Sequence, residues 1–329
     1  MTSLSVGADD GGRRLDRVLR KALPALPLSR IYRLIREGGV LVDRQPRDAA
    51  FRVQAGQEIA LPAGEGAFPA MSAAPQAGVK TSAARTAFGT LPILYESPDL
   101  LVLNKAAGIP VHGPDGSLDS LVRAYLAPRL SPSLSFRPGP LHRLDKPTSG
   151  IVVFSASLKG ARYFSALLRE GKIRKQYLAL VEGRVDGPGR WEDLLFRDRE
   201  QRGTIVSAGG KPARTGYAPL AWYPGGKSGT GGCTLLLLKP ETGRHHQIRA
   251  QAAFHGHPLA GDSVYGGHSL LNLPPLRRNP PKGPVPPFLL HAWKLAGDGL
   301  FPPLDAPPPA CFLALAETLF GPNVLPGHG

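Results

Sequence analysis

The sequence has little cysteine and no long apolar run. Its 329 residues include only two cysteines, Cys233 and Cys311, which form no metal-binding spacing and would stay reduced in a cytoplasmic chain. No apolar run reaches the ~18 residues that a membrane span requires. The first residues lack the basic and apolar segments of a signal peptide, so we expect a cytoplasmic protein. A P-loop and a dinucleotide-binding fingerprint are also missing, and we expect neither a cofactor nor a metal.

Acidic residues are scarce as well. The chain has 40 Lys and Arg against 25 Asp and Glu, a formal net charge of +15. This excess favours a polyanionic partner, either nucleic acid or an anionic surface. The length is sufficient for two domains, one of them with a large core.

Residues 11–62 form a small basic unit, with 11 Lys and Arg against five Asp and Glu in residues 11–60. Apolar residues at helical spacing predict a helix that starts near Arg14 and ends before Pro24. Ser29 is expected to cap a second helix, and short strands are expected at 40–43 and 58–61. That second helix carries three arginines at three-residue steps, Arg30, Arg33 and Arg36. A solvated helix face is the plain interpretation, but the local charge favours phosphate binding.

Residues 63–90 are rich in Ala, Gly, Pro, Ser and Thr, which predicts a flexible linker. A flexible chain of this length spans about 30 Å. The small domain is then expected to sample its polyanionic partner well away from the active site. From residue 91 the pattern changes to β-branched and leucine-rich segments, which predict strands at 93–96 and 100–105. Ser117 and Ser157 are expected to cap helices that run to Leu126 and to about Glu170.

Residues 140–154 contain the strongest candidates for catalytic side chains. Asp145 lies among the potential cations His142, Arg143 and Lys146, and a buried strand follows at 151–154. The carboxylate is thus expected on a loop held by a rigid strand, where catalytic groups often lie. Neighbouring cations favour the ionised form that a nucleophile or base needs. The alternative is a surface aspartate in a turn with a loose ion pair.

Four separate segments of the chain carry motifs whose order and spacing match those of a known family. They are Leu101-Val-Leu-Asn-Lys105, then His142-Arg-Leu-Asp-Lys-Pro-Thr-Ser-Gly150, then Lys175-Gln-Tyr-Leu-Ala-Leu-Val-Glu-Gly183, then Gly243-Arg-His-His-Gln-Ile-Arg249 with the Gly261-Asp262…Tyr265-Gly266 run. Together they resemble the RluA-type pseudouridine synthases across residues 91–315. Residues 11–62 resemble the S4-like RNA-binding domain that many members of this family carry. The chain departs from the family pattern at Ala106, His245 and Gln251.

The resemblance implies an α+β protein. A small α/β S4-like RNA-binding domain at 11–62 would precede a catalytic domain at 91–320. That domain would have a mixed, mainly antiparallel β-sheet with flanking helices and an RNA cleft along the sheet. The implied reaction is isomerisation of uridine in RNA without a cofactor. The implied substrate is large-subunit (23S) ribosomal RNA, with tRNA as the alternative, and the chain is expected to act as a monomer.

Residue roles follow from the matched positions. Asp145 matches the catalytic aspartate, which would attack the ribose anomeric carbon or abstract a ribose proton; both remain open. Tyr177 matches the tyrosine that packs against the target uracil, where it is also expected to assist proton removal from the base. Arg249 matches the basic partner of the carboxylate. Arg143 matches the arginine that fills the gap left by a flipped nucleotide. His142, Thr148 and Gln247 are expected to stabilise the loops that carry these residues and to take no part in the reaction.

Two other classes of protein compete with this interpretation. A metal-dependent phosphodiesterase would use His245, His246, His255 and His257, although no acidic pair lies near them in the sequence. A non-catalytic RNA-binding assembly factor would need none of the catalytic residues. The presence of Asp145, Tyr177 and Arg249 argues against that factor.

Overall fold

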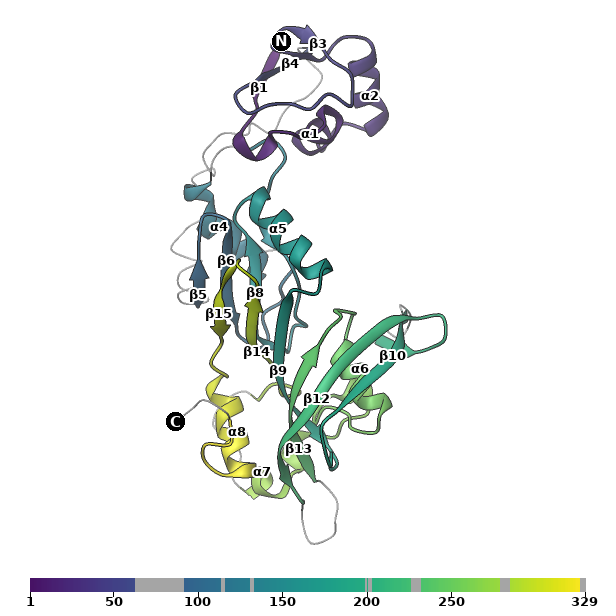
Figure 1. Ribbon diagram of the computed structural model, residues 1–329, viewed down its shortest axis with the longest axis vertical. Helices are drawn as coiled ribbons and strands as arrows, with labels where there is room; N and C mark the ends of the chain where they lie inside the picture. The colour runs from purple at the N-terminus through teal and green to yellow at the C-terminus, as the bar shows by residue number, and fades with distance from the viewer. Residues whose placement is uncertain are drawn as a thin grey trace.

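The computed structural model describes residues 1–62, 92–113, 116–130, 133–198, 200, 203–225, 232–278 and 285–325. The N-terminal domain lies at one end of an elongated molecule (Figure 1). Its four-stranded sheet has the order β1-β4-β2-β3, all antiparallel. The bounds are β1 Thr2–Ser5, β2 Leu41–Val42, β3 Gln45–Pro46 and β4 Glu58–Leu61. Helices α1 (Leu15–Ala22) and α2 (Leu28–Arg36) pack their apolar residues into one core with this sheet.

Two details of this domain differ from the sequence-based expectation. Helix α2 begins at Leu28, with Pro27 as its N-cap, so the prediction that Ser29 caps the helix was wrong. Pro27 already holds the extended backbone that an N-cap requires, and its carbonyl accepts from Arg30 and Ile31. Strand β1 lies before residue 11 and pairs with β4, so the sheet includes residues outside the range we predicted.

An 11-stranded mixed sheet forms the second domain, in the order β11-β10-β12-β13-β9-β14-β8-β6-β5, with β15 beside β14 and β7 beside β8. All pairings are antiparallel except the short one between β14 and β8. The strand bounds are β5 Ile93–Glu96, β6 Leu100–Lys105, β7 Gly139–Pro140, β8 Ser149–Ser155, β9 Ile173–Glu182, β10 Gly189–Asp198, β11 Gly203–Val206, β12 Lys211–Tyr223, β13 Cys233–Pro240, β14 Leu290–Gly297 and β15 Phe301–Asp305. The predicted α+β class, with a mainly antiparallel sheet, is confirmed.

Helices cover both faces of this sheet because successive strand residues point to opposite sides. Near β6 and β8, α4 (Leu118–Leu126) packs on one face and α5 (Leu158–Arg169) on the other. Near β9 and β13, α6 (Gln247–Phe254) packs opposite α7 (Pro274–Arg278) and α8 (Ala310–Phe320). Short 3-10 turns occupy Ala8–Asp10, Ala127–Arg129, Ser263–Tyr265 and Leu270–Asn272.

Helix capping follows the sequence in this domain. The Ser117 hydroxyl accepts from the Ser120 amide at 3.2 Å, and the Ser157 hydroxyl accepts from the Gly160 amide at 2.9 Å. Both predicted N-caps are therefore confirmed. Gly150, at the start of β8, has φ +109°, and a Cβ there would lie 2.2 Å from the Ala292 carbonyl oxygen. This close approach is what allows β14 to pair beside β8, directly after the Asp145 loop.

Two adjacent carboxylates join the domains. Asp10 is fully buried and accepts hydrogen bonds from the amides of Leu134 (2.7 Å) and Ser135 (2.8 Å) and from the Ser133 hydroxyl (2.9 Å). The Leu134 side chain packs into the N-terminal core. Asp9 accepts from the Leu158 amide at 2.8 Å, at the start of α5. These contacts hold the N-terminal domain against the catalytic domain, whereas we expected it to sample distant positions.

The predicted linker at 63–90 lies outside the described residues. Parts of the glycine-rich segment 224–232 and of the proline-rich segment 274–287 also lie outside them. Within the part of the chain that the structure describes, no helix is long and apolar enough to cross a membrane.

Candidate active site

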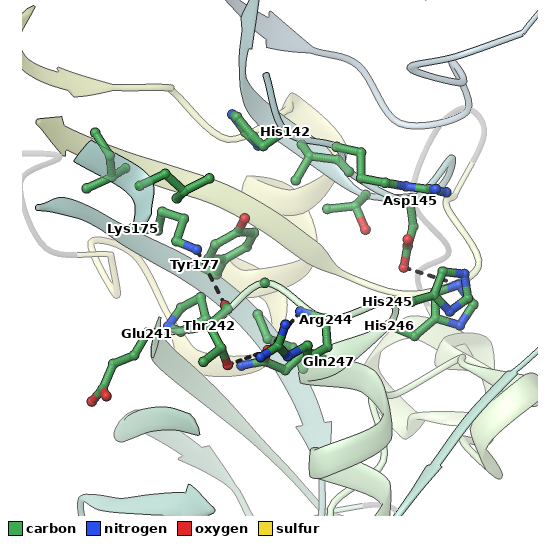
Figure 2. Close-up of a pocket in the computed structure, with 18 of the residues that line it drawn as sticks. His142, Asp145, Lys175, Tyr177, Glu241, Thr242, Arg244, His245, His246 and Gln247 are labelled. Carbon is green, nitrogen blue, oxygen red and sulfur yellow. Dashed lines mark hydrogen bonds and ion pairs between the residues drawn. The ribbon is translucent and has the colours of Figure 1, made fainter. Parts of the chain in front are cut away.

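A cavity of about 720 Å³ opens beside the central strands of the large sheet. Its wall brings together the loop before β8, the middle of β9 and the turn that leads into α6 (Figure 2). Asp145, Tyr177 and Arg249 all line this cavity, although 104 positions separate Asp145 from Arg249. The structure thus brings together the three residues predicted to be catalytic.

Asp145 lies in a tight turn, in which its carbonyl accepts from the Thr148 amide at 3.0 Å. The next strand, β8, is buried along its whole length and fixes the end of this turn. One carboxylate oxygen, Oδ2, accepts from Arg249 Nη1 at 3.2 Å. Among the described residues no donor bonds the other oxygen, Oδ1, and the side chain is 17% exposed. Asp145 therefore has one anchored oxygen and one oxygen available to a substrate.

Arg249 is held by a second carboxylate, that of Asp262. Its Nε and Nη2 donate to the two Asp262 oxygens at 2.6 and 2.8 Å, a bidentate pair that leaves Nη1 for Asp145. The guanidinium also lies over the Phe288 ring at 4.7 Å. Burial alone would lower the pKa of Arg249, but hydrogen bonds and charge from Asp262 and Asp145 raise it. A permanent cation therefore stands behind the Asp145 carboxylate.

His246 also approaches Oδ2 of Asp145. Its Nε2 lies 3.6 Å from Asp145 Oδ2, and its backbone is left-handed (φ 48°) at the N-terminus of α6. The Tyr265 hydroxyl accepts from the Thr204 amide at 2.9 Å and lies within hydrogen-bond distance of His246 Nδ1, also 2.9 Å away. The contact fixes the orientation of the imidazole, with Nε2 facing Asp145. Burial lowers the pKa of His246 to about 4, so the ring is neutral at pH 7.

Tyr177 lies at the centre of β9, between Leu238 of β13 and Ala292 of β14. Burial raises the pKa of its hydroxyl well above the ordinary range, and the Asp145 charge adds to the effect. The phenol stays protonated at neutral pH. It can offer the cavity an aromatic face and a hydroxyl, but it does not supply a phenolate base.

Lys105 stabilises the turn that contains Asp145. Its side chain is almost fully buried, and Nζ donates to the carbonyls of Ala106 (2.9 Å), Ile109 (2.9 Å) and Lys146 (3.1 Å). Burial lowers the pKa of Lys105 to about 8, although the Asp145 charge opposes this shift. The ammonium group thus links β6 to the residue that follows Asp145.

The depressed pKa of Lys105 predicts a pH-dependent stability. Between pH 8 and the unfolded value of 10.5, the unfolded chain binds more protons than the folded chain, so stability should rise with pH. Relative to Lys105→Met, the wild type should gain about 2 kcal/mol in unfolding free energy between pH 7 and 9.5. Urea unfolding of both chains at several pH values measures this difference. Parallel pH curves for the two chains would contradict the assignment.

The predicted supporting residues differ in their surroundings. His142 Nε2 accepts from the Val153 amide at 3.1 Å, and burial lowers its pKa to about 3. Gln247 uses its whole amide within the protein: it accepts from Thr242 and Arg244 and donates to Arg214 and Thr215. Both residues line the cavity while shaping its loops. The Thr148 hydroxyl is buried in the cavity wall and has no partner among the described residues.

The predicted RNA-contacting residues fall into two places. Arg143 is exposed at the rim of the cavity, directly before the catalytic turn. Arg30, Arg33 and Arg36 lie on α2 of the N-terminal domain and do not reach the cavity (Figure 1). Arg33 also forms an ion pair with Glu37 at 2.7 Å.

The four histidines of the metal hypothesis do not converge. His245 and His246 stack on each other beside Asp145, whereas His255 lies 3.2 Å from Asp193 and His257 lies 3.0 Å from the Glu182 carbonyl. Among the residues that the structure describes, no group of three or more His, Cys, Asp or Glu could hold a metal ion. The residues present do not fit the proposed phosphodiesterase centre.

Sequence reasoning assigned no role in the pseudouridine synthase site to His246, Asp262, Tyr265 and Lys105. Their signal was nonetheless present, because all four lie in the segments that carry the family resemblance. Gln251, which departs from the family pattern, is buried, accepts from Thr215 and donates to Asp193, so it joins α6 to β10 and β12.

The fold and the site together define an RNA-modifying enzyme, with a basic domain beside a cavity whose carboxylate is backed by an arginine. Comparison with known proteins agrees: residues 99–254 match the RNA pseudouridylate synthase model, and residues 13–59 match the S4 domain. The chain belongs to the RNA pseudouridylate synthase family and is an RNA pseudouridine synthase.

Individual relatives support this placement. Ribosomal large subunit pseudouridine synthase C of Escherichia coli (strain K12) is 33% identical over 270 residues, covering 80% of this chain and 79% of the relative. The protein of that name from Vibrio vulnificus (strain CMCP6) is 31% identical over 264 residues, with 80% and 79% covered. The structure of Human RNA Pseudouridylate Synthase Domain Containing 1 shares the fold, with a TM-score of 0.52 and 24% identity; the match covers 70% of this chain and 88% of that one.

Proposed function

We propose that this pseudouridine synthase acts on large-subunit ribosomal RNA, with Asp145 as its catalytic carboxylate. One observation carries the catalytic role: Oδ2 of Asp145 is anchored by Arg249, Oδ1 accepts no hydrogen bond from the described residues, and the side chain lines the cavity. A carboxylate held in this way is oriented, charged and open to a substrate on one side. The choice of RNA is supported by the two bacterial relatives, whose names specify the large ribosomal subunit.

The chemistry needs no external reagent. The bond between uracil N1 and ribose C1′ breaks, the ring turns, and a bond between C5 and C1′ forms. N1 gains a proton and C5 loses one, so the reaction is redox-neutral. Oδ1 of Asp145 either attacks C1′ or removes a ribose proton, and Arg249 stabilises the carboxylate when it is regenerated.

The cavity also suits an extruded base. Taking a uridine out of its stack costs a few kcal/mol. Stacking on an aromatic ring such as Tyr177 returns roughly 1–3 kcal/mol per base. Arg143, exposed at the cavity rim, is placed to fill the gap left in the RNA. The raised pKa of Tyr177 keeps its hydroxyl protonated, so this residue can donate a hydrogen bond to the uracil.

The S4 domain is proposed to bind RNA phosphates through α2. Replacing Arg30, Arg33 and Arg36 with glutamine should reduce the slope of log Kd against log salt by about 2 to 3, without changing turnover at saturating RNA. The matched control replaces the same three residues with lysine, which keeps the charge and should keep the slope. Filter binding over a salt series measures both variants. A wild-type slope in the glutamine variant would exclude α2 from RNA binding.

Substitution is preferred to deletion of the domain in this experiment. Asp10 and Leu134 join the two domains, so removing residues 1–62 would expose the Leu134 side chain and leave the Leu134 and Ser135 amides without their acceptor. A deletion would thus confound lost RNA binding with lost stability.

The RNA target is tested by release of tritium from RNA labelled at uracil C5. The purified enzyme should release tritium from a large-subunit ribosomal RNA transcript and not from bulk tRNA. Release from tRNA alone would overturn the choice of target but leave the reaction intact. We further infer that the enzyme acts in the cytoplasm, where it would meet ribosomal RNA, and that it acts as a monomer.

A further inference from the structure

Helix α5 connects the two parts of the molecule that the proposed function uses. Its first turns, with Lys159, Arg162 and Tyr163, line a cavity of about 430 Å³ against Ala8, Asp9 and Gly11 of the N-terminal domain. Its last turn, with Leu168 and Arg169, lines the catalytic cavity. At 1.5 Å per residue the helix is about 18 Å long. It begins beneath the N-terminal domain and runs toward β9 (Figure 1).

The outward face of α5 is basic. Lys159, Arg162, Tyr163 and Arg169 follow each other at steps of three, one and six residues, which at 3.6 residues per turn places them on one side of the helix. The buried residues Gly160, Phe164 and Leu167 occupy the opposite side. Gly160 lies against the Asp99 carbonyl, where a Cβ would come within 2.2 Å, so the helix is fixed on the sheet. The basic face is therefore held toward solvent.

Nearby acidic groups neutralise only part of this face. Lys159 forms an ion pair with Asp99 at 3.6 Å, whereas Arg162 and Arg169 have no ion pair within the described chain. Glu170 is paired with Lys172 at 2.8 Å, and the Asp9 oxygen Oδ1 accepts from the Leu158 amide. The charges of Arg162 and Arg17 also help lower the pKa of Arg13 across the domain boundary, after the larger effect of burial. Like charges thus gather where α5 meets α1.

An exposed aromatic ring lies on the basic face of α5. Tyr163 is 46% exposed, so its ring faces solvent beside Lys159 and Arg162. A basic groove with an exposed aromatic ring is the arrangement by which proteins bind single-stranded nucleic acid: the cations contact phosphates and the ring stacks on a base. This arrangement favours nucleic acid over an acidic peptide, because a peptide has no nucleobase on which Tyr163 could stack.

We propose that the outward face of α5, formed by Lys159, Arg162, Tyr163 and Arg169, binds the RNA strand between the S4 domain and the target uridine. This inference rests on the proposed function, since it deepens the RNA contact of that site. The docking of the N-terminal domain by Asp9 and Asp10 keeps α1 beside the start of this face. The RNA would then pass along one continuous basic surface into the catalytic cavity.

Two variants separate the charge from the ring. Lys159→Gln combined with Arg162→Gln should raise KM for a ribosomal RNA fragment roughly ten-fold, lower the salt slope by about 2, and leave kcat unchanged. Tyr163→Leu should weaken binding roughly ten-fold with the salt slope unchanged, because stacking releases no counterions. The matched control is Arg277→Gln with Arg278→Gln, two exposed arginines on α7 at the far end of the molecule, which should match the wild type.

Tritium release and filter binding on the same RNA decide the outcome. Wild-type KM, affinity and salt slope in both α5 variants would overturn the proposal. An equal loss in the α7 control would also overturn it, because the effect would then follow net charge alone. If the wild type binds RNA but releases no tritium from any RNA, the proposed function fails, while the binding arm still tests α5 independently.

Discussion

Asp145→Asn is expected to lower turnover by at least about 10⁴-fold, the order seen when an enzyme loses a nucleophile or base. Asparagine has the same shape and keeps an oxygen for Arg249, but it lacks the negative charge that attack on C1′ or removal of a proton requires. The turn should survive, because the Asp145 carbonyl, not its side chain, accepts from the Thr148 amide. RNA affinity should stay within about three-fold of the wild type. Single-turnover tritium release and filter binding measure the two quantities.

Asp305→Asn is the matched control for this variant. Asp305 pairs with Lys294 at 2.9 Å on the exposed edge strand β15, so the same loss of charge there should leave turnover unchanged. Retained tritium release in Asp145→Asn would remove Asp145 from the chemistry. Loss of RNA binding together with turnover would show instead that Asp145 shapes the RNA site.

Arg249→Met is expected to damage both stability and activity. Asp262 is 1% exposed and would lose both of its charged hydrogen bonds, at a cost of about 3–5 kcal/mol. Asp145 would lose its anchor, and turnover should fall by about 10²- to 10³-fold. Urea unfolding and tritium release measure the two effects.

A double variant separates these two effects. Adding Asp262→Asn to Arg249→Met removes the buried unpaired charge and should recover roughly half of the lost stability. It cannot recover activity, because Asp145 still lacks its cation. Recovery of turnover along with stability would contradict a direct role of Arg249 at the carboxylate. Arg249→Lys should also remain slow, since one ammonium cannot span two carboxylates as the guanidinium does.

Local elements of the catalytic domain were predictable from the sequence. Ser117 and Ser157 cap their helices as expected, because an N-cap depends on neighbouring amides only. The meeting of Asp145, Tyr177 and Arg249 was predictable only through the family resemblance, since no local rule relates positions so far apart. The prediction of Ser29 as the N-cap of α2 was wrong because Pro27, two residues earlier, has the extended backbone that an N-cap requires.

Long-range partners were beyond reach of the sequence. The bidentate contact of Asp262 with Arg249, and the neutral His246 held by Tyr265, depend on the strands and turns that frame the cavity. The docking of Asp10 on Ser133 and Ser135 joins residues more than 120 positions apart, and the composition of the linker suggested the opposite. The sequence did not indicate a function for the basic face of α5. The proposed function depends on the structure, in which the two ends of the helix line two different cavities.

The most direct test of the central claim maps pseudouridines in the RNA of a strain that lacks this protein. We expect specific pseudouridines to be missing from the large-subunit ribosomal RNA, to return with the wild-type gene, and not to return with Asp145→Asn. Unchanged pseudouridines in the deletion strain, or full restoration by Asp145→Asn, would contradict the account.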